Sequence, residues 1–155
     1  TDIGTSFRNV RILHVARCEL KEVQGITAFE QLEELYLAYN DIEDLYDLTM
    51  LTHLNTLDLE GNNVDSLEQI FYLKRLHRLT EVSLKNNPVT KEIGYTARLG
   101  ECVPNLQILD DEEIVGELSE FIEEKQKSCR KVSSLMDSNQ ENVYKNAFSK
   151  ILSRF

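Results

Sequence analysis

Three residue types that build hydrolytic active sites stand at separate places in this 155-residue sequence. His14, Asp58 and Ser83 would act as base, orienting acid and nucleophile if the chain cleaved an acyl bond. The serine does not lie in a GxSxG turn, and the sequence shows no oxyanion arrangement near it. We therefore interpret the chain as a protein without enzymatic activity.

Metal and cofactor chemistry has equally little support. Cys18, Cys102 and Cys129 are far apart, form no CxxC pair and have no nearby histidine, so neither a zinc site nor a disulfide framework is predicted. A reducing compartment is favoured. The sequence has no glycine-rich phosphate loop, and we interpret the acidic stretch 110–113 as a solvated end rather than a divalent-ion site. No cofactor is expected.

The charge of the chain excludes two classes of partner. The net charge is -10 at pH 7, and the acidic excess lies before residue 117. Such a surface repels nucleic-acid phosphates and anionic lipid, so we expect no direct nucleic-acid binding. No run of 18 apolar residues is present, so no membrane insertion is expected either. The expected partners are proteins, and the expected location is the cytoplasm.

The elements that must position any functional residue come from an internal repeat. Lines begun at Val10, Leu32, Leu54, Leu79 and Leu106 share the template LxxLxLxxNxIxxL, with spacings of 22, 22, 25 and 27 residues. Eight positions recur in phase in the second and third lines. This pattern predicts an α/β leucine-rich-repeat solenoid with a C-terminal cap and a helical tail.

Each repeat predicts a short strand, a turn and a return segment. Alternate side chains of the strand point inward, and stacked repeats bury them together. Asn40, Asn62 and Asn87 follow the strands, where an amide can pair with turn backbone, so we assign them a structural role; Cys18 takes that place in the first repeat. Apolar residues at every third position in 42–51 favour 3₁₀ turns, whereas 66–76 and 90–100 are expected to be helical.

The outward strand positions define a concave face, where solenoids of this type usually bind. His14, Tyr36 and Asp58 are predicted to share one column, and Arg17 and Tyr39 another. Tyrosine and arginine are enriched at binding hot spots because they offer large contact areas and several donors. A merely solvated face is the alternative. The predicted partner-binding residues are His14, Arg17, Glu34, Tyr36, Tyr39, Asp58, Glu60, Glu81 and Lys85.

The template also sets the expected domain limits. We assign 1–9 to the remnant of an upstream repeat, 10–105 to the repeats, 106–116 to the cap and 117–155 to a helical appendage. In the appendage, apolar residues at helical spacing either pack on the solenoid or bind a partner. These apolar residues form two stripes, and the second, over residues 144–155, contains the residues that we predict to bind: Phe148, Ile151, Leu152 and Phe155. The oligomeric state stays open.

Certain strings go beyond the general template. Residues 13–26 (LHVARCELKEVQGI), 34–45 (ELYLAYNDIEDL) and 57–73 (LDLEGNNVDSLEQIFYL) resemble the ciliary leucine-rich-repeat family associated with outer dynein arm assembly and intraflagellar transport. The resemblance covers about residues 2–114. It implies a non-enzymatic adaptor of the cytoplasm and the cilium or flagellum, with outer dynein arm or intraflagellar transport components as partners.

Two other roles fit the same scaffold. The repeat class is shared with a phosphatase regulator and with a leucine-rich subunit of the splicing machinery. A regulatory subunit of a phosphatase-like enzyme would use the acidic concave face to recognise a basic surface. A splicing-complex subunit is disfavoured by charge unless a protein partner holds the RNA.

Overall fold

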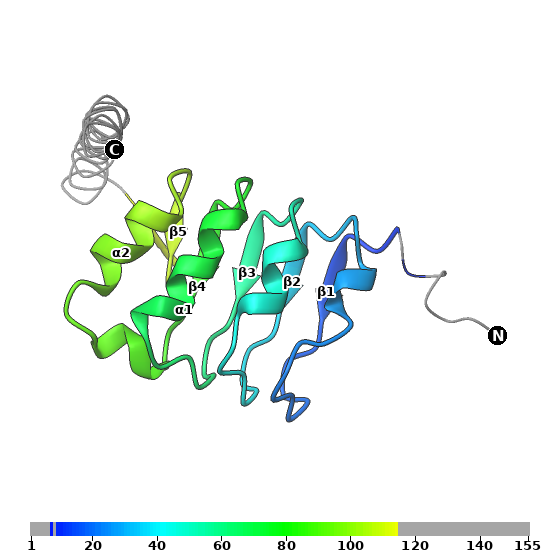
Figure 1. Ribbon diagram of the computed structural model, residues 1–155, viewed down its shortest axis with the longest axis horizontal. Helices are drawn as coiled ribbons and strands as arrows, with labels where there is room; N and C mark the ends of the chain where they lie inside the picture. Colours follow the sequence, from blue (N-terminus) through cyan, green and yellow to red (C-terminus); the bar gives the residue numbers. More distant parts are fainter. Residues whose placement is uncertain (1–6, 8, 115–155) are drawn as a thin grey trace, which may run out of the picture.

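The computed structural model describes Phe7 and residues 9–114. Within these residues, six short strands form one sheet whose spatial order follows the chain. A helical segment or loop crosses back after each of the first four strands (Figure 1). The strands are β1 (Ile12–His14), β2 (Glu34–Tyr36), β3 (Thr56–Asp58), β4 (Glu81–Ser83), β5 (Ile108–Leu109) and β6 (Glu112–Glu113). The helical segments are η2 (Ile26–Ala28), η3 (Tyr46–Met50), α1 (Leu67–Tyr72), η4 (Leu73–Arg75), η5 (Pro88–Lys91) and α2 (Tyr95–Cys102).

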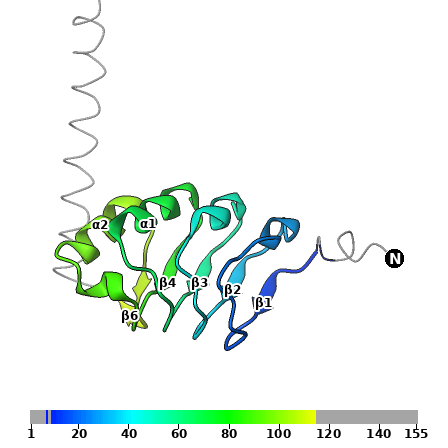
Figure 2. The same ribbon diagram turned by 60° about the horizontal axis from the view of Figure 1, so that its bottom comes forward.

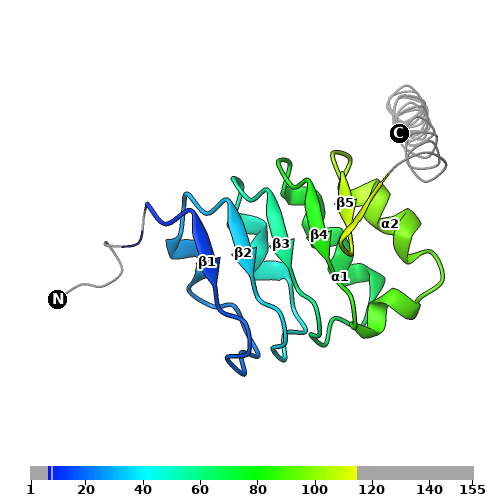
Figure 3. The ribbon, with the colours of Figure 1, turned by 180° about the vertical axis from the view of Figure 1, so that it is seen from behind.

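The molecule has two sides of different structure. Strands β1 to β5 pair in parallel and form one side, which faces the viewer in Figure 3. The helical segments form the opposite side, as the turned view in Figure 2 makes clear. We call these sides the strand face and the helical face. The arrangement confirms the predicted α/β leucine-rich-repeat solenoid.

Template leucines fill the space between the two faces. Leu35 pairs with Leu57 and Leu57 with Val82, and all three side chains are 0% exposed. Leu13, on the first strand, is only partly buried. A leucine layer is therefore fully buried from solvent only when a repeat packs on each side of it. This is why the repeats stack cooperatively.

The template asparagines connect each turn to the repeat before it. Asn62 donates through Nδ2 to the carbonyl oxygens of Leu59 and Leu37, at 2.9 and 3.0 Å. Its Oδ1 accepts from the backbone N–H of Ile42 at 3.1 Å. Asn40 and Asn87 repeat these bonds one repeat earlier and later. The predicted structural role is confirmed.

Cys18 differs because its turn opens the described sheet. Its thiol is exposed and lies 3.4 Å from the carbonyl oxygen of Ala16, while its backbone N–H donates to Oδ1 of Asn40. Cys18 thus donates its backbone N–H to the next repeat, and its own side chain makes no bond to an earlier one within the described residues. A thiol can therefore stand in this position without leaving a buried polar group unpaired.

The helical face follows the repeat length closely. The segment 42–51 contains the expected 3₁₀ helix, η3, and 66–76 contains α1 followed by η4. The continuous helix expected over 90–100 is wrong. The 3₁₀ helix η5 ends at Lys91, and α2 begins only at Tyr95, because Gly94 has a left-handed backbone (φ 90°) that interrupts regular helix.

The last strands end the described sheet with a hairpin. Strand β6 pairs antiparallel with β5, and Leu109 is buried while Leu106 is partly buried beside it. Asp110 is not the solvated residue that we expected. Its Oδ1 accepts from the Leu84 N–H at 2.7 Å, and its Oδ2 accepts from the Tyr95 hydroxyl at 3.2 Å.

Several predictions fall outside the described residues. These are most of the upstream remnant 1–9, the final two residues of the cap and the whole appendage 117–155. The proposed binding residues Phe148, Ile151, Leu152 and Phe155 belong to this part. They stay predictions.

Candidate functional site

The first column of the strand face is continuous across four strands. Register places His14 beside Tyr36, Tyr36 beside Asp58 and Asp58 beside Ser83. The rings of His14 and Tyr36 stack with centroids 4.2 Å apart and planes 4° from parallel. The predicted column is confirmed, and it presents a flat aromatic platform next to a carboxylate.

The second column begins with Arg17 and Tyr39, as predicted. The guanidinium carbon of Arg17 lies 4.3 Å from the centre of the Tyr39 ring, within the range of a cation–π contact. This column continues at Gly61 and Asn86, and all four residues have positive φ. Glu60 and Lys85, which we also predicted to face the partner, each stand one residue before a member of this column, Gly61 and Asn86. The recurring left-handed residue is therefore part of the repeat's turn.

Gly61 is a site residue that the sequence reasoning missed. A Cβ at this position would lie 2.6 Å from Cδ1 of Tyr39, so the phenol ring rests directly against the glycine backbone. The φ of 65° also favours glycine. Its spacing of 22 residues from Tyr39 was the available signal, because template phase places each turn residue beside its equivalent.

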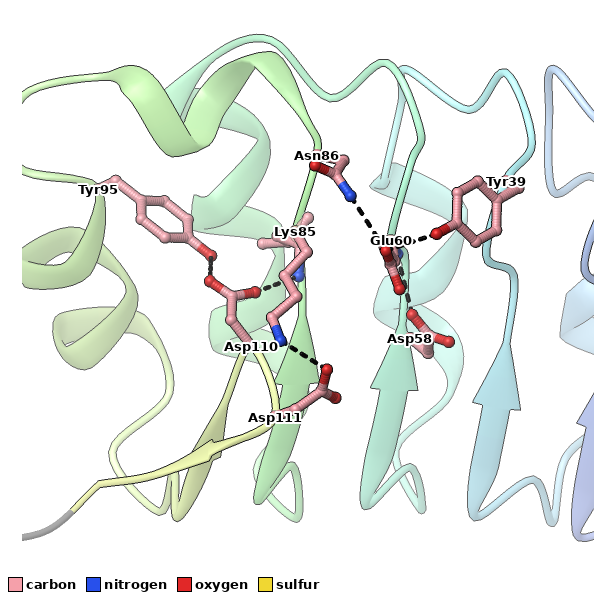
Figure 4. Close-up of polar contacts among 9 residues, drawn as sticks. Tyr39, Asp58, Glu60, Lys85, Asn86, Tyr95, Asp110 and Asp111 are labelled. Atoms are coloured by element: carbon pink, nitrogen blue, oxygen red, sulfur yellow. Dashed lines mark hydrogen bonds and ion pairs between the residues drawn. The ribbon is translucent and has the colours of Figure 1, made fainter.

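Glu60 joins the two columns into one network (Figure 4). Its Oε1 accepts from the Tyr39 hydroxyl at 2.6 Å and from Nδ2 of Asn86 at 3.0 Å. Its backbone N–H donates to Oδ1 of Asp58 at 2.9 Å. These bonds hold the Tyr39 ring in place, which lowers the conformational entropy that the Tyr39 side chain would lose when a partner binds.

Lys85 is less available than its charge implies. Its Nζ lies 2.7 Å from Oδ2 of Asp111, which follows the last parallel strand. The bond is exposed and raises the pKa of the lysine above its ordinary value. Lys85 therefore neutralises a neighbouring carboxylate, and the surrounding strand face keeps its acidic character.

The local charges fix the protonation of both tyrosines. The hydrogen bond from Tyr36 to Oε2 of Glu34, at 2.8 Å, is the main cause that raises the pKa of Tyr36 to about 12; burial and neighbouring carboxylates add to it. The hydrogen bond to Glu60 likewise raises the pKa of Tyr39. Both phenols therefore stay neutral at physiological pH.

Asp58 is the carboxylate least well accommodated in this face. Partial burial raises its pKa, and the negative charges of Glu60 and Asp111 raise it further, although the hydrogen bond from the Glu60 N–H opposes them. A positive group placed next to Asp58 would relieve both effects.

A small cavity of about 60 Å³ lies beside Asp58. Tyr36, Glu81, Ser83 and Asp111 help to line it. Ser83 is only 7% exposed, and its Oγ has no hydrogen-bond partner among the residues described. Burial of an unpaired hydroxyl is costly, so the cavity presents a free hydrogen-bonding group surrounded by carboxylates.

The geometry does not assemble the three residues of hydrolytic type. His14 and Ser83 lie three strand spacings apart in the same column, or about 14 Å between their backbones. A base must lie within hydrogen-bonding reach of its nucleophile, so His14, Asp58 and Ser83 do not form a triad.

Other candidate residues have structural explanations. Cys102 is buried, and burial raises the pKa of its thiol, which makes it unreactive. His53 is half-buried, and its Nδ1 is buried without a partner in the described chain. Over the same residues, no group of three metal-ligating side chains is present. Nor does any helix there have the length and apolar character needed to cross a membrane.

Comparison with known families supports the assignment of the fold as a leucine-rich-repeat solenoid. The family pattern for two copies of the leucine-rich repeat matches residues 30–72, which include β2, η3, β3 and α1. Residues 30–72 therefore match the leucine-rich repeat, and the described sheet continues the same arrangement on both sides of them. Proteins of this class generally serve as protein-binding scaffolds, and the exposed strand face described above is suited to that role.

Two curated relatives match most of this chain. The chain is 40% identical over 122 residues to leucine-rich repeat-containing protein 56 of Rattus norvegicus and 38% identical to that of Homo sapiens. Each match covers 71% of this chain. It spans 22% of the length of each relative, so this chain corresponds to only part of much longer proteins.

Solved structures share the fold. The Drosophila melanogaster SNF/U2A′ complex contains a chain with a TM-score of 0.68 and 21% identity, covering 84% of this chain and 79% of that one. The Chaetomium Mex67:Mtr2 structure gives a TM-score of 0.57 and 27% identity, covering 75% and 88%. These likenesses support the solenoid architecture.

Proposed function

We propose that the strand face binds a basic segment of a protein partner, with one lysine or arginine head group entering the cavity beside Asp58. The observation that carries this proposal is the unpaired Oγ of Ser83 in a cavity lined by three carboxylates, those of Asp58, Glu81 and Asp111. A cationic head group would neutralise charge there and give Ser83 a donor to accept from.

The rest of the face supplies contact area around that point. The stacked rings of His14 and Tyr36 and the fixed ring of Tyr39 are exposed or half-buried, so a partner backbone can lie across them. Rigid aromatic side chains lose little entropy on binding and often dominate interface energies. Glu34 and Glu60 extend the acidic surface on either side of the cavity.

The biological setting that we propose is that of a ciliary adaptor. Its support is the resemblance of residues 13–26, 34–45 and 57–73 to the family associated with outer dynein arm assembly and intraflagellar transport. In this setting the basic segment belongs to an outer dynein arm or transport component, and the protein is found in the cytoplasm and the cilium or flagellum.

Affinity purification from ciliated cells tests the proposal. The tagged chain is compared with the paired change Tyr36→Ala and Tyr39→Ala, and co-purified proteins are identified by mass spectrometry. Ile93→Ala serves as the control, because Ile93 is a large apolar side chain that is 98% exposed and follows η5, away from the strand face. We expect dynein-arm or transport proteins with the wild type and the control, and their loss with the double variant.

Two further results would change this conclusion. Phosphatase or splicing proteins lost in the double variant would keep the strand face as the binding site and replace the ciliary setting. Partners retained by the double variant would show that the strand face is not the site. The basic character of the segment is tested by Asp58→Asn with Glu81→Gln, which should weaken binding and reduce its dependence on salt.

A further inference from the structure

The helical face carries an open groove between two successive repeats. Its volume is about 500 Å³, within the range of pockets that hold ligands. The walls come from η3 and from the α1–η4 segment, which crosses the helical face next to it (Figure 1). None of this surface belongs to the strand face, so the groove is separate from the proposed basic-segment site.

Large apolar side chains are concentrated in this groove. Tyr46, Met50 and Phe71 are 56%, 64% and 54% exposed, and all three line it. Tyr46 packs edge-on against Tyr72 with ring centroids 5.5 Å apart. Side chains of this size are normally exposed one at a time, and a cluster of them marks an interaction site.

The polar lining of the groove carries one sign of charge. Lys74 and Arg75 supply this charge, His77 adds an imidazole ring, and no acidic residue lines the groove. Lys74 holds its ammonium 5.5 Å from the centre of the Phe71 ring, and neither Lys74 nor Arg75 has an ion-pair partner in the described part of the chain. Unpaired cations gathered beside an apolar surface are unexpected in a chain with 27 acidic and 17 basic residues.

We propose that this groove binds an acidic segment of a protein partner that carries large apolar side chains among its carboxylates. The apolar side chains would cover Tyr46, Met50 and Phe71, while the carboxylates would pair with Lys74 and Arg75. Charge complementarity selects this occupant, because Lys74 and Arg75 would repel a basic segment, whereas the acidic strand face would attract it. The two faces would then hold segments of opposite charge at the same time.

Peptide display on the immobilised full chain tests this proposal. A random 16-residue library is selected on the wild type, and each recovered peptide is measured against the paired change Lys74→Glu and Arg75→Glu. The matched control is Lys21→Glu with Lys91→Glu, which makes the same charge change at two exposed lysines outside the groove. Circular dichroism confirms that each variant is folded.

We expect peptides rich in glutamate or aspartate and in large apolar residues. Their affinity should fall about tenfold or more in the Lys74 and Arg75 variant and in Phe71→Ala, and stay unchanged in the control, as for loss of a charged and an apolar hot spot. Recovery of basic peptides only, of none above background, or of peptides insensitive to these changes would overturn the proposal.

Two alternative occupants are separated by further measurements on the same protein. A zero-length cross-link between Lys74 and a glutamate of 117–124 would show that the chain's own appendage fills the groove. A dimer in light scattering that the paired reversal dissociates would show a second copy there. Either result replaces the proposed partner. If no peptide binds the groove, the strand-face proposal is unaffected, because that proposal is tested separately by the Tyr36→Ala and Tyr39→Ala variant.

Discussion

Replacement of Asn62 by alanine is the sharpest test of how the repeats are held together. The carbonyl oxygens of Leu37 and Leu59 each accept from two amides, so Asn40 and Asn87 still satisfy them after the change. The N–H of Ile42 loses its acceptor and stays buried. An orphaned amide costs about 1–3 kcal/mol and each of the two weakened carbonyls about 0.5–1.5 kcal/mol, which gives a loss of about 2–6 kcal/mol.

Urea unfolding followed by circular dichroism measures this free energy directly. Asn63→Ala is the matched control, because Asn63 is exposed and the same substitution there should change stability by less than about 0.5 kcal/mol. A loss for Asn62→Ala that is as small as that of the control would refute the reasoning, since it would mean that water or a backbone shift replaces the amide without penalty.

Three further predictions concern the core and the strand face. Leu57→Ala removes a fully buried template leucine and should cost about 2–5 kcal/mol in the same urea assay; an unchanged midpoint would contradict the repeat phase. Gly61→Ala should cost about 1–2 kcal/mol from its left-handed backbone alone, and should also displace the Tyr39 ring, visible as a changed tyrosine signal in near-ultraviolet circular dichroism. Asp58→Asn removes a carboxyl whose folded pKa is raised above its ordinary value of about 4. Because ionising such a group opposes folding, the variant should be at least as stable as the wild type at pH 7, and this advantage should shrink as the pH falls below about 4. A variant less stable at pH 7 than at pH 4, relative to the wild type, would reverse this sign.

The fold was predictable because the same apolar spacing recurs in several successive repeats. Leu35, Leu57 and Val82 recur in phase, and one register satisfies all of them. Prediction was weaker where the repeat length changes. The helix expected over 90–100 starts late because Gly94 adopts a left-handed conformation, and a single glycine within a helical pattern does not reveal its φ.

The strand face was predictable in outline but not in its interactions. Alternation along a strand fixes which side chains point outward, so His14, Tyr36 and Asp58 were assigned to one column correctly. Pairing between columns depends on side-chain rotamers across repeats. The contacts of Glu60 with Tyr39 and Asn86, and the unpaired Ser83 hydroxyl, therefore had no signal in the sequence.

The sequence by itself determined the solenoid, the order of its strands, the asparagine connections and the acidic character of the strand face, because these depend on periodicity and composition. Only the tertiary structure decided that Asp110 is bound by Leu84 and Tyr95, and that Tyr46, Met50 and Phe71 meet beside unpaired cations. Such contacts join residues some 15 to 30 positions apart on different turns. A pattern of spacing records which side a residue faces, but the distance between two side chains is set by the packing of the repeats that carry them.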